Sequence, residues 1–206
     1  MTDIVSLIFD YLGTFAFAIS GIRLASAKQF DWYGAYVVGF ITAVGGGTVR
    51  DLLLNTTPFW MVTPSYLIVS ALALLFVIVF RKSVIRLNNT LLFIFDTIGL
   101  GLFVVVGISK TLDAGFPMWV AIAMGTITGS CGGMMRDIMI NEVPLIFRKE
   151  IYALACLFGG LAYMFCLKLG IGVATTQILA ATSVIVIRIL AVRYKISVPV
   201  LRGEDN

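Results

Sequence analysis

The chain repeats itself, and this repeat limits what it can fold into more than any other feature. Residues 8–66 align without a gap with residues 94–152, so every residue of the first copy has a counterpart 86 positions later. Both copies begin with the triplet IFD, and the segment GGGTVRD from Gly45 recurs as CGGMMRD from Cys131. A repeat at a fixed offset indicates a fold that uses one structural unit twice.

The composition places this unit in a membrane. Hydrophobic residues make up 60% of the chain, charged residues 13%, and the mean hydropathy is +1.02. Soluble domains are nearer half apolar and a quarter charged, so this chain could not cover a surface exposed to water. We therefore predict an all-α integral membrane protein. Apolar stretches of roughly 20 residues, enough for a spanning helix, occur about seven times, at 4–25, 32–54, 62–80, 88–109, 118–140, 150–167 and 171–192.

Each copy of the repeat contains three of the expected helices. Repeat one covers about 4–80 and repeat two about 88–167, and the seventh helix at about 171–192 has no counterpart within the single membrane domain 1–206. Because three crossings reverse the direction of the chain, the second copy must enter the bilayer from the opposite face. Inverted repeats of this kind typically build a pathway centred near the bilayer midplane.

The basic residues predict the orientation of the chain. One face of the expected bundle collects most of the positive charge and is expected to be cytoplasmic. It holds Arg23, Lys28, Arg81, Lys82, Arg86, Arg148, Lys149, Arg193, Lys195 and Arg202. The other face holds Lys110 and Lys168. We therefore expect a multi-pass protein of the cell (inner) membrane with its N-terminus outside and its C-terminus inside. Charges that lie along a membrane surface also argue against a nucleic-acid partner.

A polar stripe follows the expected helix 32–54 and recurs on the expected helix 118–140. Its four positions, at i, i+3, i+7 and i+11, fall on one narrow face of a helix. They are Gly39, Thr42, Gly46 and Arg50 in the first copy and Gly125, Thr128, Gly132 and Arg136 in the second. An arginine at membrane depth costs several kcal/mol unless it faces protein or water. The stripes are therefore expected to line a polar pathway, and close helix packing through small residues is the alternative.

Glycine runs lie beside both stripes, at Gly45–Gly47 and at Gly132–Gly133. Each glycine costs a helix interior about 1 kcal/mol relative to alanine, so we expect both helices to bend or unwind there. The carbonyls freed in this way are tolerated only where they line a cavity or meet protein. Pro58 and Pro144 follow the runs and are expected to end the two helices. We place a constriction close to the runs, at Thr42, Thr128 and Ser130.

Ionisable residues accompany the stripes in both copies. Those at membrane depth are Asp10, Arg50, Asp51, Asp96, Arg136 and Asp137. None is expected to be charged alone in that environment, so the pairs Asp10–Arg50 and Asp96–Arg136 are predicted, with the acid that follows each arginine as a competitor. Such pairs could hold helices together, screen the pathway, or do both.

The residue types give no support to an enzyme or a metal site. The chain has no histidine, which excludes the common zinc and catalytic-triad arrangements. Its cysteines, Cys131, Cys156 and Cys166, lie in apolar stretches with spacings that fit no metal pattern. The polar residues form no nucleophile–base arrangement. We expect no catalytic residue, no metal and no cofactor.

Taken together, these residues resemble the trimeric intracellular cation (TRIC) channel family in its prokaryotic branch. The likeness rests on the paired GGGTVRD and CGGMMRD segments, the repeated IFD starts and the segment RKEIYA at Arg148–Ala153, and it covers nearly the whole chain. The resemblance implies a homotrimer in membrane lipid, with one pore in each protomer. It also implies passive conduction of monovalent cations, chiefly potassium, through helices 32–54 and 118–140, kinked at their glycines.

Two alternatives to the channel remain open at this point. The same family has also been labelled a glycine transporter, and an inverted repeat suits a secondary transporter of a small zwitterion equally well. A purely structural membrane protein would account for the hydrophobicity but not for the duplicated Arg-Asp motif. Regulation by an acidic inositol lipid, known in animal members of the family, is not expected here. The middle of helix 118–140 has no lysine, and the second glycine run begins with Cys131.

Overall fold

The protein is an all-helical membrane protein, seen here in a computed structural model that describes residues 4–80 and 88–199. Arg81, Lys82, Arg86 and Arg202, which support the predicted orientation, lie outside the described residues. The long helices are α1 (Ile4–Ala27), α2 (Trp32–Leu53), α4 (Ser65–Val79), α6 (Asn88–Asp113), α7 (Met118–Met139), α8 (Ala153–Lys168) and α9 (Val173–Arg193). Two short elements follow α2 and α7, namely α3 (Phe59–Val62) and the 3-10 turn η1 (Leu145–Phe147).

All seven expected helices are present, and the differences lie at their ends. Helix α6 continues to Asp113 rather than 109, whereas α4 and α8 are shorter than expected, with 15 and 16 residues. Within residues 4–80 and 88–199, four helices, α1, α6, α7 and α9, are long and apolar enough to cross a membrane by length and composition alone. The two short elements were not predicted, and each occupies the first residues after a proline of the repeat.

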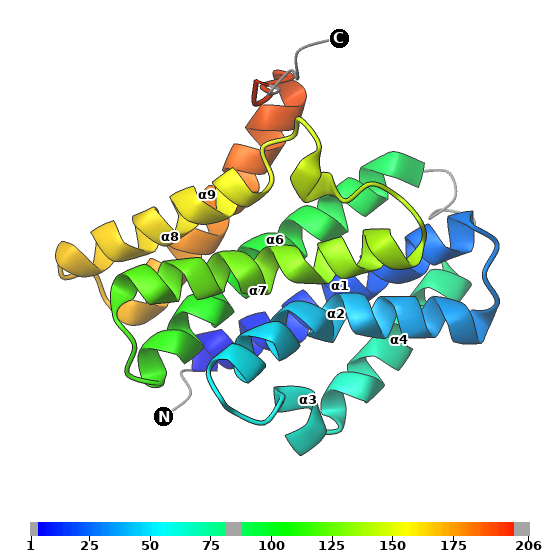
Figure 1. Cartoon of the computed structure of the whole chain (residues 1–206), viewed down its shortest axis with the longest axis horizontal. Helices are drawn as coiled ribbons and strands as arrows, with labels where there is room; N and C mark the ends of the chain where they lie inside the picture. Colours follow the sequence, from blue (N-terminus) through cyan, green and yellow to red (C-terminus); the bar gives the residue numbers. More distant parts are fainter. Residues whose placement is uncertain (1–3, 81–87, 200–206) are drawn as a thin grey trace, which may run out of the picture.

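The two copies of the repeat form equivalent halves. Helices α1, α2, α6 and α7 pack against one another as a central group, α4 packs against α1 and α2, and α8 packs against α6 and α7. Figure 1 shows α4 on one side of this central group and α8 with α9 on the other. Helix α9, which has no counterpart in the first half, packs against α6 and α8.

Equivalent helices run in opposite directions, as the inverted repeat requires. A side chain at Gly13 of α1 would meet Phe103 of α6, and one at Gly99 of α6 would meet Phe17 of α1. The contact therefore moves backward along α6 as the chain advances along α1. The ring centroids of Phe17 and Phe103 lie 5.2 Å apart at the centre of this contact. These two residues are repeat counterparts, so equivalent positions of the two halves meet there.

The helices that carry the polar stripes end at Leu53 and Met139, several residues before the prolines. Asn55 follows α2 with φ 56° and Asn141 follows α7 with φ 58°, a left-handed conformation that asparagine tolerates better than most residues. In both copies the next residue donates its backbone N–H to the carbonyl five residues back, at 2.8 Å, which closes the helix end. The expectation that Pro58 and Pro144 end these helices is therefore wrong by a few residues.

Candidate functional site

The polar stripes of the two halves meet where α2 crosses α7. A Cβ atom added to Gly46 would collide with the carbonyl oxygen of Thr128, and one added to Gly132 would collide with the carbonyl oxygen of Thr42. The two helices thus touch backbone to backbone at two points related by the repeat. Only glycine permits an approach this close, because any side chain would press against a carbonyl that belongs to the opposite helix.

Both glycine runs remain α-helical, which contradicts unwinding, and a bend at the glycines stays a prediction. The helices continue without interruption from Trp32 to Leu53 and from Met118 to Met139. Close helix packing, the alternative to a polar pathway, accounts for the presence of glycine at these positions in this conformation. Their neighbours are side chains or carbonyls of other elements. In the order Gly39, Gly45, Gly47, Gly125 and Gly133, these neighbours are Ile22, Met135, Phe59, Ile108 and Tyr152.

The hydroxyl groups proposed for the constriction are buried near this crossing. Thr42 is 0% exposed, Thr128 1% and Ser130 3%. Each hydroxyl donates a hydrogen bond of 2.6 to 2.7 Å to the carbonyl four residues earlier in its own helix, as is common for Ser and Thr in membrane helices. Because the hydroxyl hydrogen is used in this way, the oxygen keeps lone pairs that can accept from another group.

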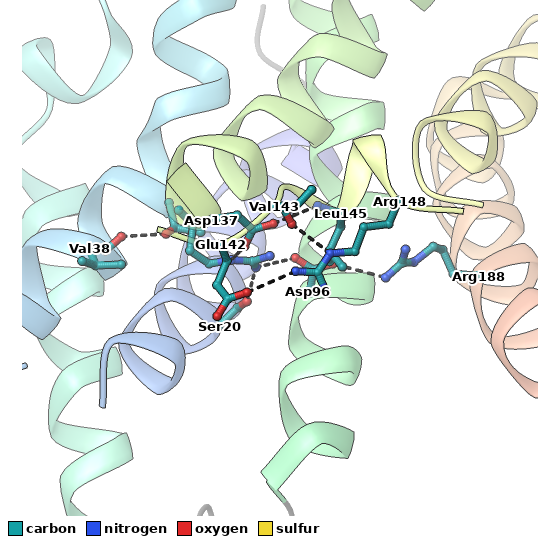
Figure 2. A network of polar contacts seen from close by, with 11 residues as sticks. Ser20, Val38, Asp96, Asp137, Glu142, Val143, Leu145, Arg148 and Arg188 are labelled. Carbon is teal, nitrogen blue, oxygen red and sulfur yellow. Dashed lines mark hydrogen bonds and ion pairs between the residues drawn. The ribbon is translucent and has the colours of Figure 1, made fainter. Parts of the chain in front are cut away.

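A cluster of four charged residues lies at one end of the crossing. Asp96 accepts from Arg136 Nη1 at 2.6 Å, as predicted, and also from Arg188 Nη2 at 3.3 Å. Asp137 accepts from Arg136 Nε at 2.9 Å, and Ser20 lies 2.6 Å from Arg136 Nη1. Figure 2 shows Arg188 reaching Asp96 from α9. We call Asp96, Arg136, Asp137 and Arg188 the second-half cluster, and its two acids balance its two arginines.

The equivalent cluster of the first half is built differently from the prediction. Asp10 pairs with Lys110 at 2.6 Å and accepts from the hydroxyl of Tyr66 at 3.0 Å, while Arg50 pairs with Asp51 at 2.7 Å. Among the described residues, no ion pair joins Asp10 to Arg50, because Lys110 from the end of α6 occupies the carboxylate. We call Asp10, Arg50, Asp51 and Lys110 the first-half cluster, and its charges also balance.

Lys110 and Arg188 are the members of the clusters that the sequence analysis missed. Neither has a basic counterpart 86 residues away, so the repeat gives no signal for them. Arg188 is 1% exposed and its guanidinium carbon lies 4.6 Å from the centre of the Tyr152 ring. Tyr66 and Tyr152 are repeat counterparts; Tyr66 donates to Asp10, whereas Tyr152 lies under the guanidinium of Arg188.

The acid after each arginine also fixes the start of a short element. Asp51 Oδ2 accepts from the backbone N–H of Phe59 at 2.9 Å, and Asp137 Oδ2 accepts from that of Leu145 at 3.0 Å. The first oxygen of each carboxylate binds the neighbouring arginine. One carboxylate therefore ties the end of a long helix to the start of α3 or η1, which places the arginine in a fixed position.

An exposed ion pair joins the two halves on the face predicted to be cytoplasmic. Lys28, after α1, donates to Glu142, after α7, at 2.7 Å, and Arg148 lies 3.4 Å from the same carboxylate. The hydrogen bond and charge of Lys28 lower the pKa of the Glu142 carboxyl below its usual value. The stabilisation from this pair is therefore present at neutral pH and is lost as the pH falls through the lowered pKa.

Comparison with known proteins agrees with this architecture. The family model described as Glycine transporter matches residues 7–82 and 93–168, which are the two halves. The inner membrane protein YadS of Escherichia coli K12 is 36% identical over 199 residues, 96% of each chain. A solved TRIC cation channel is 36% identical, with a TM-score of 0.85, and the match covers 97% of this chain and 98% of that one.

A second solved structure extends the comparison. The TRIC trimeric intracellular cation channel orthologue from Rhodobacter sphaeroides is 31% identical, with a TM-score of 0.87, and the match covers 94% of this chain and 100% of that one. The likeness spans both halves and the seventh long helix. The multi-pass inner-membrane architecture and the fold are those of these relatives, and the chain belongs to the prokaryotic TRIC channel family.

Proposed function

We propose that this protein is a passive channel for monovalent cations, chiefly potassium, with a pore between α2 and α7 of each protomer. Its family is one of channels rather than enzymes. The observation that carries the proposal is the position of the two charge-balanced clusters, one in each half, with the α2–α7 crossing between them. A cation passing either cluster would meet no unneutralised arginine.

The crossing itself is the proposed constriction. Thr42, Gly46, Thr128 and Gly132 meet there, and in this conformation the crossing is closed by contact between the two backbones. Opening requires α2 and α7 to separate. Separation would uncover the carbonyl oxygens of Thr42 and Thr128, which already point at the facing helix, since the glycines opposite them have no side chains to cover them. Carbonyl oxygens can replace part of the hydration shell of potassium.

The remaining residues of the stripes have different neighbours. Gly45, Gly47, Ser130 and Gly133 flank the crossing and are proposed to shape the path. Gly39 and Gly125 instead pack against α1 and α6, where a Cβ atom would lie 2.9 Å from the carbonyl of Ala18 and 2.7 Å from that of Val104. Gly39 and Gly125 therefore hold helices together and are not among the residues proposed to line the pore.

Recording from a planar bilayer tests the channel against the transporter that the description of the family model suggests. Purified protein should give discrete current steps whose size increases with potassium concentration and does not depend on glycine. Saturable uptake of glycine into vesicles, without current steps, would replace our proposal with a secondary transporter. Native mass spectrometry should give three times the mass of the 22.4 kDa chain, as expected for a trimer.

The orientation predicts the sides on which the two termini lie. A reporter fused to the C-terminus should report the cytoplasm, and one fused to the N-terminus the outside, because Lys28 and Arg148 lie together on the basic face. Alkaline phosphatase and green fluorescent protein fusions measure this. Equal signals from both ends would contradict an odd number of crossings.

Neutralising Asp10 should reduce potassium conductance. Asp10→Asn removes the partner of Lys110, whose side chain is 24% exposed. Two unit charges ~6 Å apart at an effective dielectric of ~20 interact by roughly 3 kcal/mol. Solvent screening should leave about half of this, a roughly tenfold fall in single-channel conductance. The double change Asp10→Asn with Lys110→Gln should restore most of it.

Asp31→Asn is the matched control, since Asp31 caps α2 on the exposed surface and has no role in the proposed path. Its conductance should equal that of the unchanged protein. If Asp10→Asn conducts normally in channels that assemble, the carboxylate does not screen the path.

A further inference from the structure

The exposed ion pair between Lys28 and Glu142 joins one end of α2 to one end of α7, the two helices that cross. Lys28 lies in the loop 28–31 that leads directly from α1 into α2, and Glu142 follows the end of α7. Figure 1 shows the start of α2 and the end of α7 at the same end of the bundle. The two charged atoms lie 2.7 Å apart. We call this pair the Lys28–Glu142 clamp.

Both partners of the clamp are fixed close to the helices that they join. Glu142 donates its backbone N–H to the carbonyl of Asp137 at 2.8 Å, so it moves with the end of α7. Lys28 donates its backbone N–H to the carbonyl of Ala25 at 3.1 Å, and the loop that follows it is too short to absorb a large movement of α2. A separation of α2 from α7 at this end must therefore stretch or break the clamp.

The repeat places no equivalent contact at the other end of the crossing. The counterparts of Lys28 and Glu142 are Ala114 and Thr56, which carry no charge. The backbone is nevertheless alike, since Thr56 donates its N–H to the carbonyl five residues back at 2.8 Å, as Glu142 does. Among the described residues, no ion pair joins the end of α2 to the start of α7. The clamp therefore acts at one end of the crossing only.

A cavity of about 130 Å³ lies between the clamp and the second-half cluster. Its lining includes Glu142 and Arg148, which are exposed, and Arg136 and Asp137, which are buried. Figure 2 shows Arg148 reaching Glu142 in the same region as Asp137. The volume has room for a few water molecules. The clamp thus stands beside the route from the surface to the charged residues that a cation would pass.

We propose that the Lys28–Glu142 clamp controls opening of the channel from the face predicted to be cytoplasmic. The inference rests on the proposed path between α2 and α7. The other polar contact between the halves at this end, from Arg136 to Ser20, is buried and out of reach of solution. The side chains of Lys28 and Glu142 are each 41% exposed, so dissolved ions can screen the clamp. Breaking it favours separation of the helices.

Single-channel recording measures the effect on opening. Glu142→Gln and Lys28→Gln should each raise the ratio of open to closed time by about two- to fivefold, the factor that loss of an exposed ion pair gives. The double variant should rise no further than either single one, because both changes break the same contact. Arg148→Gln is the matched control. It removes a positive charge 3.4 Å from the same carboxylate, but Arg148 belongs to the same half as Glu142, so the ratio should not rise.

A distance measurement tests the clamp without any current. Spin labels on Tyr33→Cys and Ile138→Cys, at exposed positions near the two clamped ends, report the separation of α2 and α7 by pulsed electron paramagnetic resonance. Labelled protomers are diluted with unlabelled ones, and protein without the two changes measures any labelling of the native cysteines. Glu142→Gln should add a population at longer distance, and Arg148→Gln should not.

The two measurements distinguish failure of the clamp from failure of the channel. An unchanged distance distribution in Glu142→Gln would overturn the clamp, whatever the current. A longer distance in a protein that gives no current steps would support the clamp as a contact between moving helices and would count against the channel.

Discussion

Asp96→Asn should destabilise the folded protein by about 3–5 kcal/mol, the cost of breaking a buried ion pair by removing one partner. The change takes a charge from Arg188 and Arg136 at once, and both arginines are at most 1% exposed. Asp137 still neutralises Arg136, so Arg188 is left with Glu150, 3.7 Å away and 44% exposed. Thermal unfolding of the protein in detergent, followed by tryptophan fluorescence, measures the loss.

A second substitution in the same cluster separates lost charge balance from lost shape. The double change Asp96→Asn with Arg188→Met removes the stranded charge but keeps a long side chain, and should recover a substantial part of the stability. Glu142→Gln, which breaks an exposed pair on the same face of the protein, should leave the unfolding temperature nearly unchanged. An Asp96→Asn protein as stable as the wild type would show that the cluster tolerates an unbalanced arginine.

Gly46→Ala should destabilise the protein by about 3 kcal/mol, at the upper end of the usual cost of overpacking. The added methyl group would meet the carbonyl oxygen of Thr128. That atom is part of the α7 backbone, so the two helices must move apart to make room. Gly132→Ala should behave in the same way through the carbonyl of Thr42. Because both substitutions separate the same helices, their double variant should lose less than the sum of the two.

The adjacent glycine provides the control. A Cβ atom at Gly45 would lie 2.6 Å from the sulfur of Met135, and a methionine side chain can move aside at little cost. Gly172→Ala, where no atom lies within 4 Å of the new methyl group, should also be tolerated. Chemical denaturation of all four variants compares them on one scale. Equal stability of Gly45→Ala and Gly46→Ala would mean that the backbone contact at the crossing does not hold the helices together.

The glycine runs show where local propensity is a poor guide. Their composition predicts a weakened helix, yet both helices continue through them, because propensity is a small term that packing commonly outweighs. The repeat is unambiguous in the sequence, and it predicts three helices in each half and the opposite direction of the two halves, whereas the seventh helix is predicted from hydropathy alone. The facing carbonyls of Thr42 and Thr128 could not be foreseen, since a stripe of small residues does not say which backbone it will face.

The pairing of the acids shows a second limit of the sequence. Asp96 meets Arg136 as the spacing predicts, whereas its repeat counterpart Asp10 meets Lys110. The repeat predicts only what the two halves share. Lys110 and Arg188 come from positions where the copies differ, and their contacts depend on how α6 and α9 are rotated, which hydropathy does not determine.

The two ends of the crossing differ in how far solvent reaches their charged residues. One end holds a lysine that solvent reaches in part, at 24% exposure, and the other holds an arginine sealed at 1%. Solution on the first side can screen its cluster, while solution on the second side cannot. We therefore expect rectification, with inward and outward currents of different size in symmetrical potassium chloride. A current–voltage curve would show it, and Lys110→Gln should change its curvature. The two halves share one fold, so a difference between inward and outward current would come from Lys110 and Arg188, which have no basic counterparts in the repeat.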